Sequence, residues 1–201
     1  MKKKKRWFYI LITIIIFLSS LLIFLNIWFY KMIKKPSQSQ EKEMNQMISH
    51  ILPQLNYYNH EINIQNLTKE EQLWFGLKIT YHLPHTTKIT IIQNNQKQIQ
   101  IPFEEVQKTL KQYFNISLNN ENQSLPYFIT YNSFNDSYLI SNIETFGNYQ
   151  TDFHYQIIKQ KKFMNKNIIT VKSTSQNEEN IYEVQFICNK SCYFVSSKII
   201  K

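Results

Sequence analysis

The stretch WFYILITIIIFLSSLLIFLNIWFY, residues 7–30, carries no charge and decides how the chain is organised. As an α-helix, its 24 residues would span about 36 Å, which exceeds the roughly 30 Å hydrocarbon core of a bilayer. Aromatic rings stand at both ends, where membrane interfaces favour them: Trp7 and Tyr9 at one end, Trp28 and Tyr30 at the other. The stretch therefore predicts a transmembrane helix.

The charges that flank this stretch predict its orientation. Residues 1–6 form a basic tail with five consecutive cationic side chains, and three lysines follow the stretch within five positions. Because cytoplasmic flanks carry the excess of Lys and Arg, the tail favours a cytoplasmic N-terminus and a domain outside the cytoplasm. A cleaved signal peptide would have a shorter apolar region that ends in small residues. We therefore expect an uncleaved, single-pass anchor in the cell membrane, with residues 7–30 in contact with the lipid bilayer.

Most of the net charge belongs to the anchor region. The sequence has 23 basic and 14 acidic residues, but eight of the basic ones precede Pro36, which leaves 15 basic residues in the remainder. A nearly neutral domain lacks the basic footprint of nucleic-acid-binding proteins, so we expect no nucleic-acid partner. We assign residues 31–43 to a polar linker and residues 44–201 to one α+β domain. The lack of alanine, with abundant Lys, Asn and Ile, indicates an A+T-rich coding sequence.

Three apolar stripes in the domain follow helical spacing. The first stripe consists of Met44, Met47, Ile48, Ile51, Leu52 and Leu55. The second helix should begin at a capping box, in which Thr68 precedes Glu71 by three residues, and should end before Pro84. The third helix should follow Pro102, with one apolar side made of Phe103, Val106, Leu110, Tyr113 and Phe114.

Period-two alternation, which is typical of half-buried strands, appears in two parts of the domain. Residues 88–93 and 97–101 alternate around Asn94-Asn95, which suits a hairpin turn. From Tyr127 onward, short alternating runs are separated by turns, which predicts an antiparallel meander. Helices that precede a run of strands indicate an α+β fold, with about three helices packed on a curved antiparallel sheet.

Three blocks of the domain carry a resemblance to known proteins: LTKEEQLWFGLKITYH at residues 67–82, EEVQKTLKQYFN at residues 104–115 and YEVQFICNKSCYFVSSKI at residues 182–199. They look like uncharacterised membrane-anchored extracytoplasmic proteins of low-G+C bacteria. The order of elements also resembles cystatin-like and NTF2-like folds, as an analogy of fold alone. The resemblance implies an anchor and an outer domain, but those proteins have no established activity that would assign a role to any residue.

Cys188 and Cys192 are the two cysteines of the chain. In one straight strand their Cα atoms would lie about 13 Å apart, which is too far for a disulfide. A three-residue hairpin loop over residues 189–191 would instead place them opposite each other on one face, together with Phe186 and Phe194. The sequence thus favours a disulfide that clips the hairpin in an oxidising compartment, and the alternative is two free thiols.

The histidines suggest no metal site. His82 and His85 flank Pro84, and this proline prevents one helical face from holding both rings. A positive or polarisable group beside the last carbonyls of a helix is favourable, so a position at the helix end explains His82 better than metal binding. We predict no metal ligand and no cofactor-binding residue.

The acidic pairs do not indicate a catalytic centre either. Glu70-Glu71 and Glu104-Glu105 fall in the first turns of predicted helices, where negative charge is favourable, and Glu178-Glu179 fall in a predicted turn. Nucleophile-elbow, metalloprotease and phosphate-binding motifs are missing from the sequence, and two glycines provide little for a phosphate-binding loop. We therefore predict no catalytic residue.

Five lysines cluster around a predicted hairpin and alternate with aromatic side chains: Lys159, Lys161, Lys162, Lys166 and Lys172. Such a cluster could contact anionic wall polymers or lipid headgroups. Lysines also protect an edge strand from pairing with another chain, and the sequence favours this second interpretation.

These observations predict a membrane-anchored, extracytoplasmic interaction or envelope-support module. Its partner would be an envelope protein or a wall polymer. The alternative is an enzyme that acts on a cell-wall or extracellular substrate through an unrecognised active site. A deep pocket with converging Glu, His or Tyr side chains would favour the enzyme, and a filled sheet concavity would argue against it.

Overall fold

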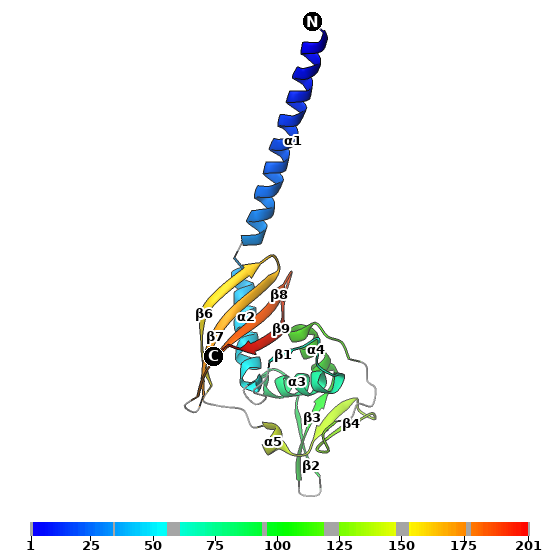
Figure 1. Cartoon of the computed structure of the whole chain (residues 1–201). Coiled ribbons are helices and arrows are strands. Elements are labelled where there is room, and N and C mark those ends of the chain that lie inside the picture. The colour runs from blue at the N-terminus through cyan, green and yellow to red at the C-terminus, as the bar shows by residue number, and fades with distance from the viewer. Residues whose placement is uncertain are drawn as a thin grey trace.

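The computed structural model describes residues 2–33, 35–55, 61–93, 96–118, 125–147, 153–175 and 178–200. A long N-terminal helix projects from an α+β domain that contains two antiparallel sheets (Figure 1). This structure confirms three predictions: the α+β class, the N-terminal apolar helix and the three main helices of the domain. The predicted curved antiparallel sheet is confirmed in part, because the strands divide into a five-stranded and a four-stranded sheet.

Helices α1 (Lys2–Ile33) and α2 (Gln38–Leu55) are separated by a much shorter connection than the predicted linker over residues 31–43. The start of α2 explains the difference. The Ser37 hydroxyl accepts a hydrogen bond from the Gln40 amide at 3.2 Å, and the Gln40 side chain accepts one from the Ser37 amide at 3.2 Å. This reciprocal cap begins α2 inside a stretch whose polar composition is typical of a linker.

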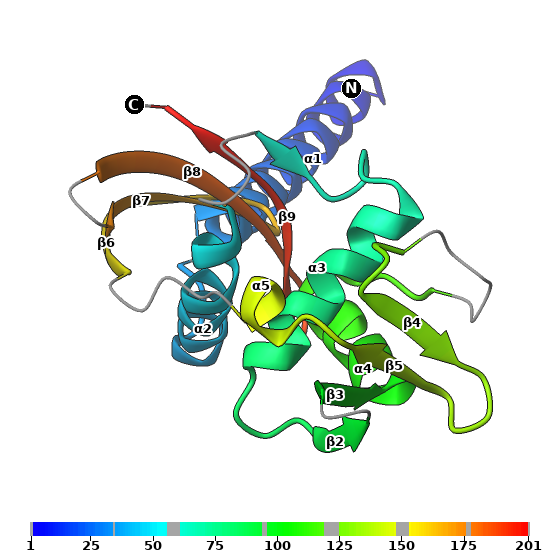
Figure 2. The ribbon, with the colours of Figure 1, turned by 90° about the horizontal axis from the view of Figure 1, so that it is seen from below.

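The five-stranded sheet consists of β1 (Ile62–Asn63), β6 (His154–Phe163), β7 (Lys166–Ser175), β8 (Glu178–Cys188) and β9 (Cys192–Ile199). Its strand order is β1-β9-β8-β7-β6, with antiparallel neighbours throughout. The sheet is curved, and α2 lies in its concavity (Figure 2). The predicted apolar stripe of α2 is fully buried, together with inward side chains of the sheet that include Ile169, Val171, Tyr182, Val184, Phe186 and Phe194.

The four-stranded sheet consists of β2 (Ile89–Gln93), β3 (Gln96–Pro102), β4 (Ile129–Asn132) and β5 (Ser137–Ile140), in the order β2-β3-β5-β4. The predicted meander from residue 127 is therefore corrected. Its first two strands pair with the β2–β3 hairpin through β5, because Ile101 lies opposite Tyr138 and Ile99 lies opposite Ile140. Alternation identifies strands but does not identify their partners. The predicted turn at Asn94-Asn95 lies outside the described residues.

Helix α4 (Phe103–Phe114) connects the two sheets, since it contacts both β9 and β3, and α3 (Lys69–His82) packs against α4. The predicted capping box at the start of α3 is present, and the helix ends at its cap Leu83, immediately before the proline. Gly76 allows α3 and α4 to approach closely, because a Cβ atom there would lie 2.7 Å from the Leu110 side chain. The short helix α5 (Ile143–Gly147) contacts α3.

Strand β6 contains an irregularity that the sequence analysis missed. Its register against β7 shifts between Ile157 and Lys159, as expected of a β-bulge. Before the shift, Ile157 lies opposite the buried Val171. After the shift, Phe163 lies opposite Lys166, on the exposed face. The shift therefore changes which side chains of β6 face α2.

Candidate functional site

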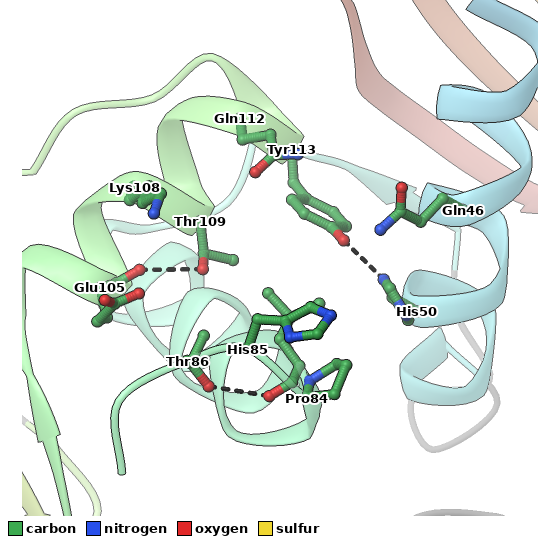
Figure 3. Close-up of a pocket in the computed structure, with 11 residues that line it drawn as sticks. Gln46, His50, Pro84, His85, Thr86, Glu105, Lys108, Thr109, Gln112 and Tyr113 are labelled. Carbon is green, nitrogen blue, oxygen red and sulfur yellow. Dashed lines mark hydrogen bonds between the residues drawn. The ribbon is translucent and has the colours of Figure 1, made fainter. Parts of the chain in front are cut away.

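A cavity of about 240 Å³ lies between α2, α4 and the loop that follows α3 (Figure 3). Gln46 and His50 reach it from α2. The loop and α4 contribute the other lining residues: Leu83, Pro84, His85, Thr86, Glu105, Lys108, Thr109, Gln112 and Tyr113. The cavity brings together imidazole, phenol, carboxylate and ammonium groups that are separated by up to 63 residues in the sequence.

His50 and Tyr113 form the central polar contact of this cavity. The His50 Nδ1 and Tyr113 Oη atoms lie 2.6 Å apart and share a hydrogen bond (Figure 3). Burial lowers the pKa of His50, so its imidazole is neutral at physiological pH. Tyr113 is 1% exposed, which fixes its ring in the core. The pair therefore presents a neutral polar surface rather than a charge.

Helical spacing and one loop position the rest of the lining. Gln46 lies one turn before His50 on α2, and Glu105, Thr109 and Gln112 repeat at three- or four-residue intervals along α4. Thr86 shapes the loop, because its hydroxyl donates to the Thr80 carbonyl at 2.8 Å and to the Leu83 carbonyl at 2.9 Å. The resulting cavity is smaller than most small-molecule sites, which measure about 300 to 1,000 Å³.

The two sequence-predicted histidines occupy different environments. His85 lines the cavity, whereas His82 is half-buried and is not part of the lining. Burial, followed by the nearby charges of Lys78, Lys88 and His50, lowers the pKa of His82 to about 4. His82 lies in the last turn of α3 as predicted, but it is neutral there, so it acts as a polarisable group and not as a cation. Lys88 supplies that charge instead, since its Nζ donates to the Tyr81 carbonyl at 2.5 Å and the Leu83 carbonyl at 3.0 Å.

The three acidic pairs lie in different elements, and each occupies a structural position. Glu70-Glu71 and Glu104-Glu105 occupy the first turns of α3 and α4 as predicted. The turn predicted for the third pair, Glu178-Glu179, is wrong, because Glu178 begins strand β8. Glu179 forms a 2.7 Å salt bridge with Lys172 of the neighbouring strand, which accounts for its charge. In the part of the chain that the structure describes, no group of three or more His, Cys, Asp and Glu residues is arranged to hold a metal ion.

Lys78 is a buried charge that the sequence analysis missed. It is 7% exposed, and its Nζ donates to the Phe146 carbonyl of α5 at 2.5 Å. The same Nζ lies 5.3 Å from the ring centroid of Trp74 and 4.8 Å from that of Phe146. Burial lowers the pKa of Lys78 to about 8. This lysine therefore attaches α5 to α3 through a hydrogen bond and two cation–π contacts.

The cysteines lie at the end of the β8–β9 hairpin that is nearest to α1. Their Sγ atoms are joined at 1.99 Å and their Cα atoms lie 4.0 Å apart across the loop of residues 189–191. Cys188 lies opposite Cys192 and Phe186 lies opposite Phe194, which confirms the predicted hairpin and its shared face. Both cysteines are buried, at 6% and 1% exposure.

Helix α1 is long and apolar enough to cross a membrane over Ile12–Tyr30. All side chains in this range are exposed, so the domain does not cover them. Trp7, Trp28 and Tyr30 are 72%, 41% and 70% exposed. Tyr9 lies within α1, but its side chain is not among those that the structure describes.

Comparison with known proteins finds no matching family, no matching curated protein and no matching solved structure. The resemblance to uncharacterised membrane-anchored proteins therefore stays a prediction.

Proposed function

We propose that the protein is a single-pass membrane protein whose α+β domain acts outside the cytoplasm as an interaction or envelope-support module. The observation that carries this proposal is the complete exposure of the apolar range Ile12–Tyr30. A core helix of a soluble protein would bury such side chains against its own fold, whereas the lipid bilayer would cover them here.

The disulfide supports the outward orientation. Glutathione and thioredoxin keep cytosolic thiols reduced, whereas secreted and extracytoplasmic proteins retain disulfides. Cys188 and Cys192 are paired in the folded hairpin, and the basic run Lys2–Arg6 precedes the anchor on the side that the positive-inside rule assigns to the cytoplasm.

The geometry of the domain favours an interaction role over catalysis. The concave face of the five-stranded sheet, which could otherwise hold a ligand, is filled by α2. The cavity beside His50 is small, and the domain is nearly neutral. An envelope protein or a wall polymer therefore fits better as a partner than a nucleic acid.

External protease provides the test of topology. Protease added to intact, wall-stripped cells should remove the domain, while a cytoplasmic marker protein survives. Replacement of Lys2–Arg6 by Gln should reduce the cleaved fraction, because it removes the main orientation signal. Full protection of the domain in intact cells, or a mature N-terminus near residue 31, would contradict the proposal.

The alternative function, an enzyme for wall or extracellular substrates, is favoured by one observation. The cavity does bring His50, Tyr113, Glu105 and His85 together. If it were catalytic, the full chain would release soluble fragments from purified cell wall, and the His50→Phe variant would not. The proposed interaction role predicts no release by either protein, and unchanged retention of an envelope partner by the variant.

A further inference from the structure

The first turn of α2 locates the end of the domain that faces the membrane. Only residues 34–37 separate it from α1, and four residues extend over at most about 14 Å. The Gln40 Nε2 atom donates to the Asn189 carbonyl at 2.9 Å, and the Glu43 carboxylate accepts from the Cys192 amide at 2.9 Å. These bonds hold the β8–β9 turn at the same end as the anchor.

The β6–β7 turn is held there as well. The Asn165 carbonyl accepts a hydrogen bond from the Cys188 amide at 2.7 Å, and the Asn165 side chain donates to the Asn189 side chain at 3.3 Å. Strand β6 also contacts α1. Figure 1 shows this turn beside the start of α2, and the β4–β5 hairpin in the half of the domain away from α1.

The side chains at the β6–β7 turn combine apolar surface with positive charge. Phe163 and Met164 are 58% and 45% exposed. Four lysines lie in the two turns or in the strand ends next to them: Lys161, Lys162, Lys166 and Lys190. The acidic residues on the first turns of α2 are Glu41 and Glu43, and Glu43 already accepts the Cys192 amide. This end of the domain therefore carries an excess of positive charge.

The bulge in β6 accounts for the exposure of Phe163. Without the register shift after Ile157, alternation would direct Phe163 toward the α2 side of the sheet. With it, Phe163 lies opposite Lys166 on the outer face. Lysines alone would protect the edge strand β6 from pairing with another chain, and that role gives no reason to expose Phe163 and Met164 between them.

We propose that the β6–β7 turn is a second membrane contact, in which Phe163 and Met164 enter the interface and the surrounding lysines bind anionic lipid headgroups. The proposal rests on the proposed membrane anchoring by α1. Aromatic and apolar side chains partition into the interfacial layer, and juxtamembrane lysines are attracted to an anionic surface within a Debye length of about 8 Å. Two points of contact would orient the domain against the membrane rather than leave it to rotate about its tether.

Photocrosslinking of the full chain in lipid nanodiscs tests this contact. p-Benzoylphenylalanine replaces Phe163, Phe134 or Trp28 in separate variants. Phe134 is the matched control, because it is 99% exposed in the turn between β4 and β5. Trp28 reports on the anchor itself. We expect lipid adducts at positions 163 and 28 and background yield at position 134, and the same substitution at Met164 should repeat the result for 163.

The outcomes separate the contact from the anchor. Adducts at position 28 with only background yield at positions 163 and 164 would overturn the second contact and leave the anchor intact. Background yield at all positions would overturn both proposals. Adducts at position 163 that disappear when a soluble polyanion is added, while those at position 28 persist, would assign the turn to an anionic polymer and would also overturn the lipid contact.

The charge of the bilayer tests the lysines. In nanodiscs rich in phosphatidylglycerol, the triple variant Lys161→Gln, Lys162→Gln and Lys166→Gln should lower the adduct yield at position 163 by roughly fivefold or more, since one lysine near an anionic surface contributes about that factor. In phosphatidylcholine nanodiscs the triple variant should change the yield little. An equal yield from both proteins in the anionic bilayer would overturn the role of the lysines in the proposal.

Discussion

Helix α2 separates two regions of opposite character. On one side, its apolar stripe packs against the five-stranded sheet in a core of Met, Ile, Leu and aromatic side chains. On the other side, Gln46 and His50 face a cavity shared with α4, where polar and charged groups line the surface. The difference indicates that truncation of a packed core side chain should cost more stability than a change at the cavity. The cavity retains polar groups and open volume, and it should tolerate change better.

The largest expected effect is on the apolar side. Phe186→Ala should lower the free energy of unfolding by about 3 to 5 kcal/mol, because Phe186 is a fully buried residue of β8 that lies opposite Phe194 of β9. Urea unfolding of the full chain in detergent, followed by near-ultraviolet ellipticity, provides the measurement. Phe134→Ala is the control and should cost under about 0.5 kcal/mol, since that ring is exposed. Equal losses of stability from Phe186→Ala and Phe134→Ala would contradict the prediction that a packed core side chain contributes more stability than an exposed one.

Lys78 should produce the next largest effect, as a dependence on pH. Its pKa is about 8 in the folded protein and about 10.5 when exposed, so the unfolded state binds more protons between these values. Stability that depends on Lys78 therefore rises with pH across this window. The stability of the wild type minus that of Lys78→Met should increase by about 2 to 3 kcal/mol between pH 7 and pH 10.5.

The same unfolding measurement, repeated at several pH values, checks this dependence. The exposed Lys97→Met variant provides the control, and its difference from the wild type should stay flat across the window. A flat profile for Lys78→Met would show that burial of the Lys78 ammonium does not lower the stability of the folded state. Lys78 would then behave like an exposed lysine.

The disulfide should contribute less than the core beside it. Replacement of Cys188 and Cys192 by Ser should cost about 2 kcal/mol, because the closed loop is short and its closure restricts the unfolded chain little. Treatment of the wild type with dithiothreitol should give the same loss under the same unfolding conditions. A loss larger than that of Phe186→Ala would mean that the covalent clip, rather than packing, stabilises the α2–sheet layer.

The smallest effect is expected in the cavity. Tyr113→Phe removes the hydrogen bond to His50 and should cost about 1 kcal/mol, since water in the adjoining cavity can replace the lost partner. Tyr127→Phe, at a tyrosine that is 90% exposed, should cost under about 0.5 kcal/mol and is the control. A loss above about 3 kcal/mol at Tyr113 would show that the cavity side is as intolerant as the apolar core.

The sequence predicted those parts of the fold that depend on neighbours in the chain. Thr68 and Glu71 cap α3, Pro84 follows its end, and the loop between Cys188 and Cys192 forms the last hairpin. In each case the deciding residues are within five positions of one another. The division of the strands into two sheets could not be predicted, because partner choice depends on contacts such as Ile101 with Tyr138, 37 residues apart.

The candidate sites were harder to predict, because they too depend on contacts between residues that are far apart in the sequence. His50 and Tyr113 meet across 63 residues, and neither belongs to a motif. Lys78 looks like an ordinary helix lysine until α5 and the Trp74 ring cover it. The lysines near Phe163 were visible in the sequence, but their position beside α1 depends on Asn165 and the bulge after Ile157, which alternation alone does not indicate.

The short connection between α1 and α2 also determines how the domain would respond to mechanical load. A pull on α1 reaches α2 first, at the turn that is hydrogen-bonded to Asn189 and Cys192. Because α2 lies along the sheet, this force would act in shear on the whole packed layer instead of peeling one contact at a time (Figure 1). The covalent link between Cys188 and Cys192 closes the hairpin at the loaded end, so β8 and β9 cannot separate from that end first. The packed layer and its covalent clip should therefore resist a force that is applied to the domain through α1.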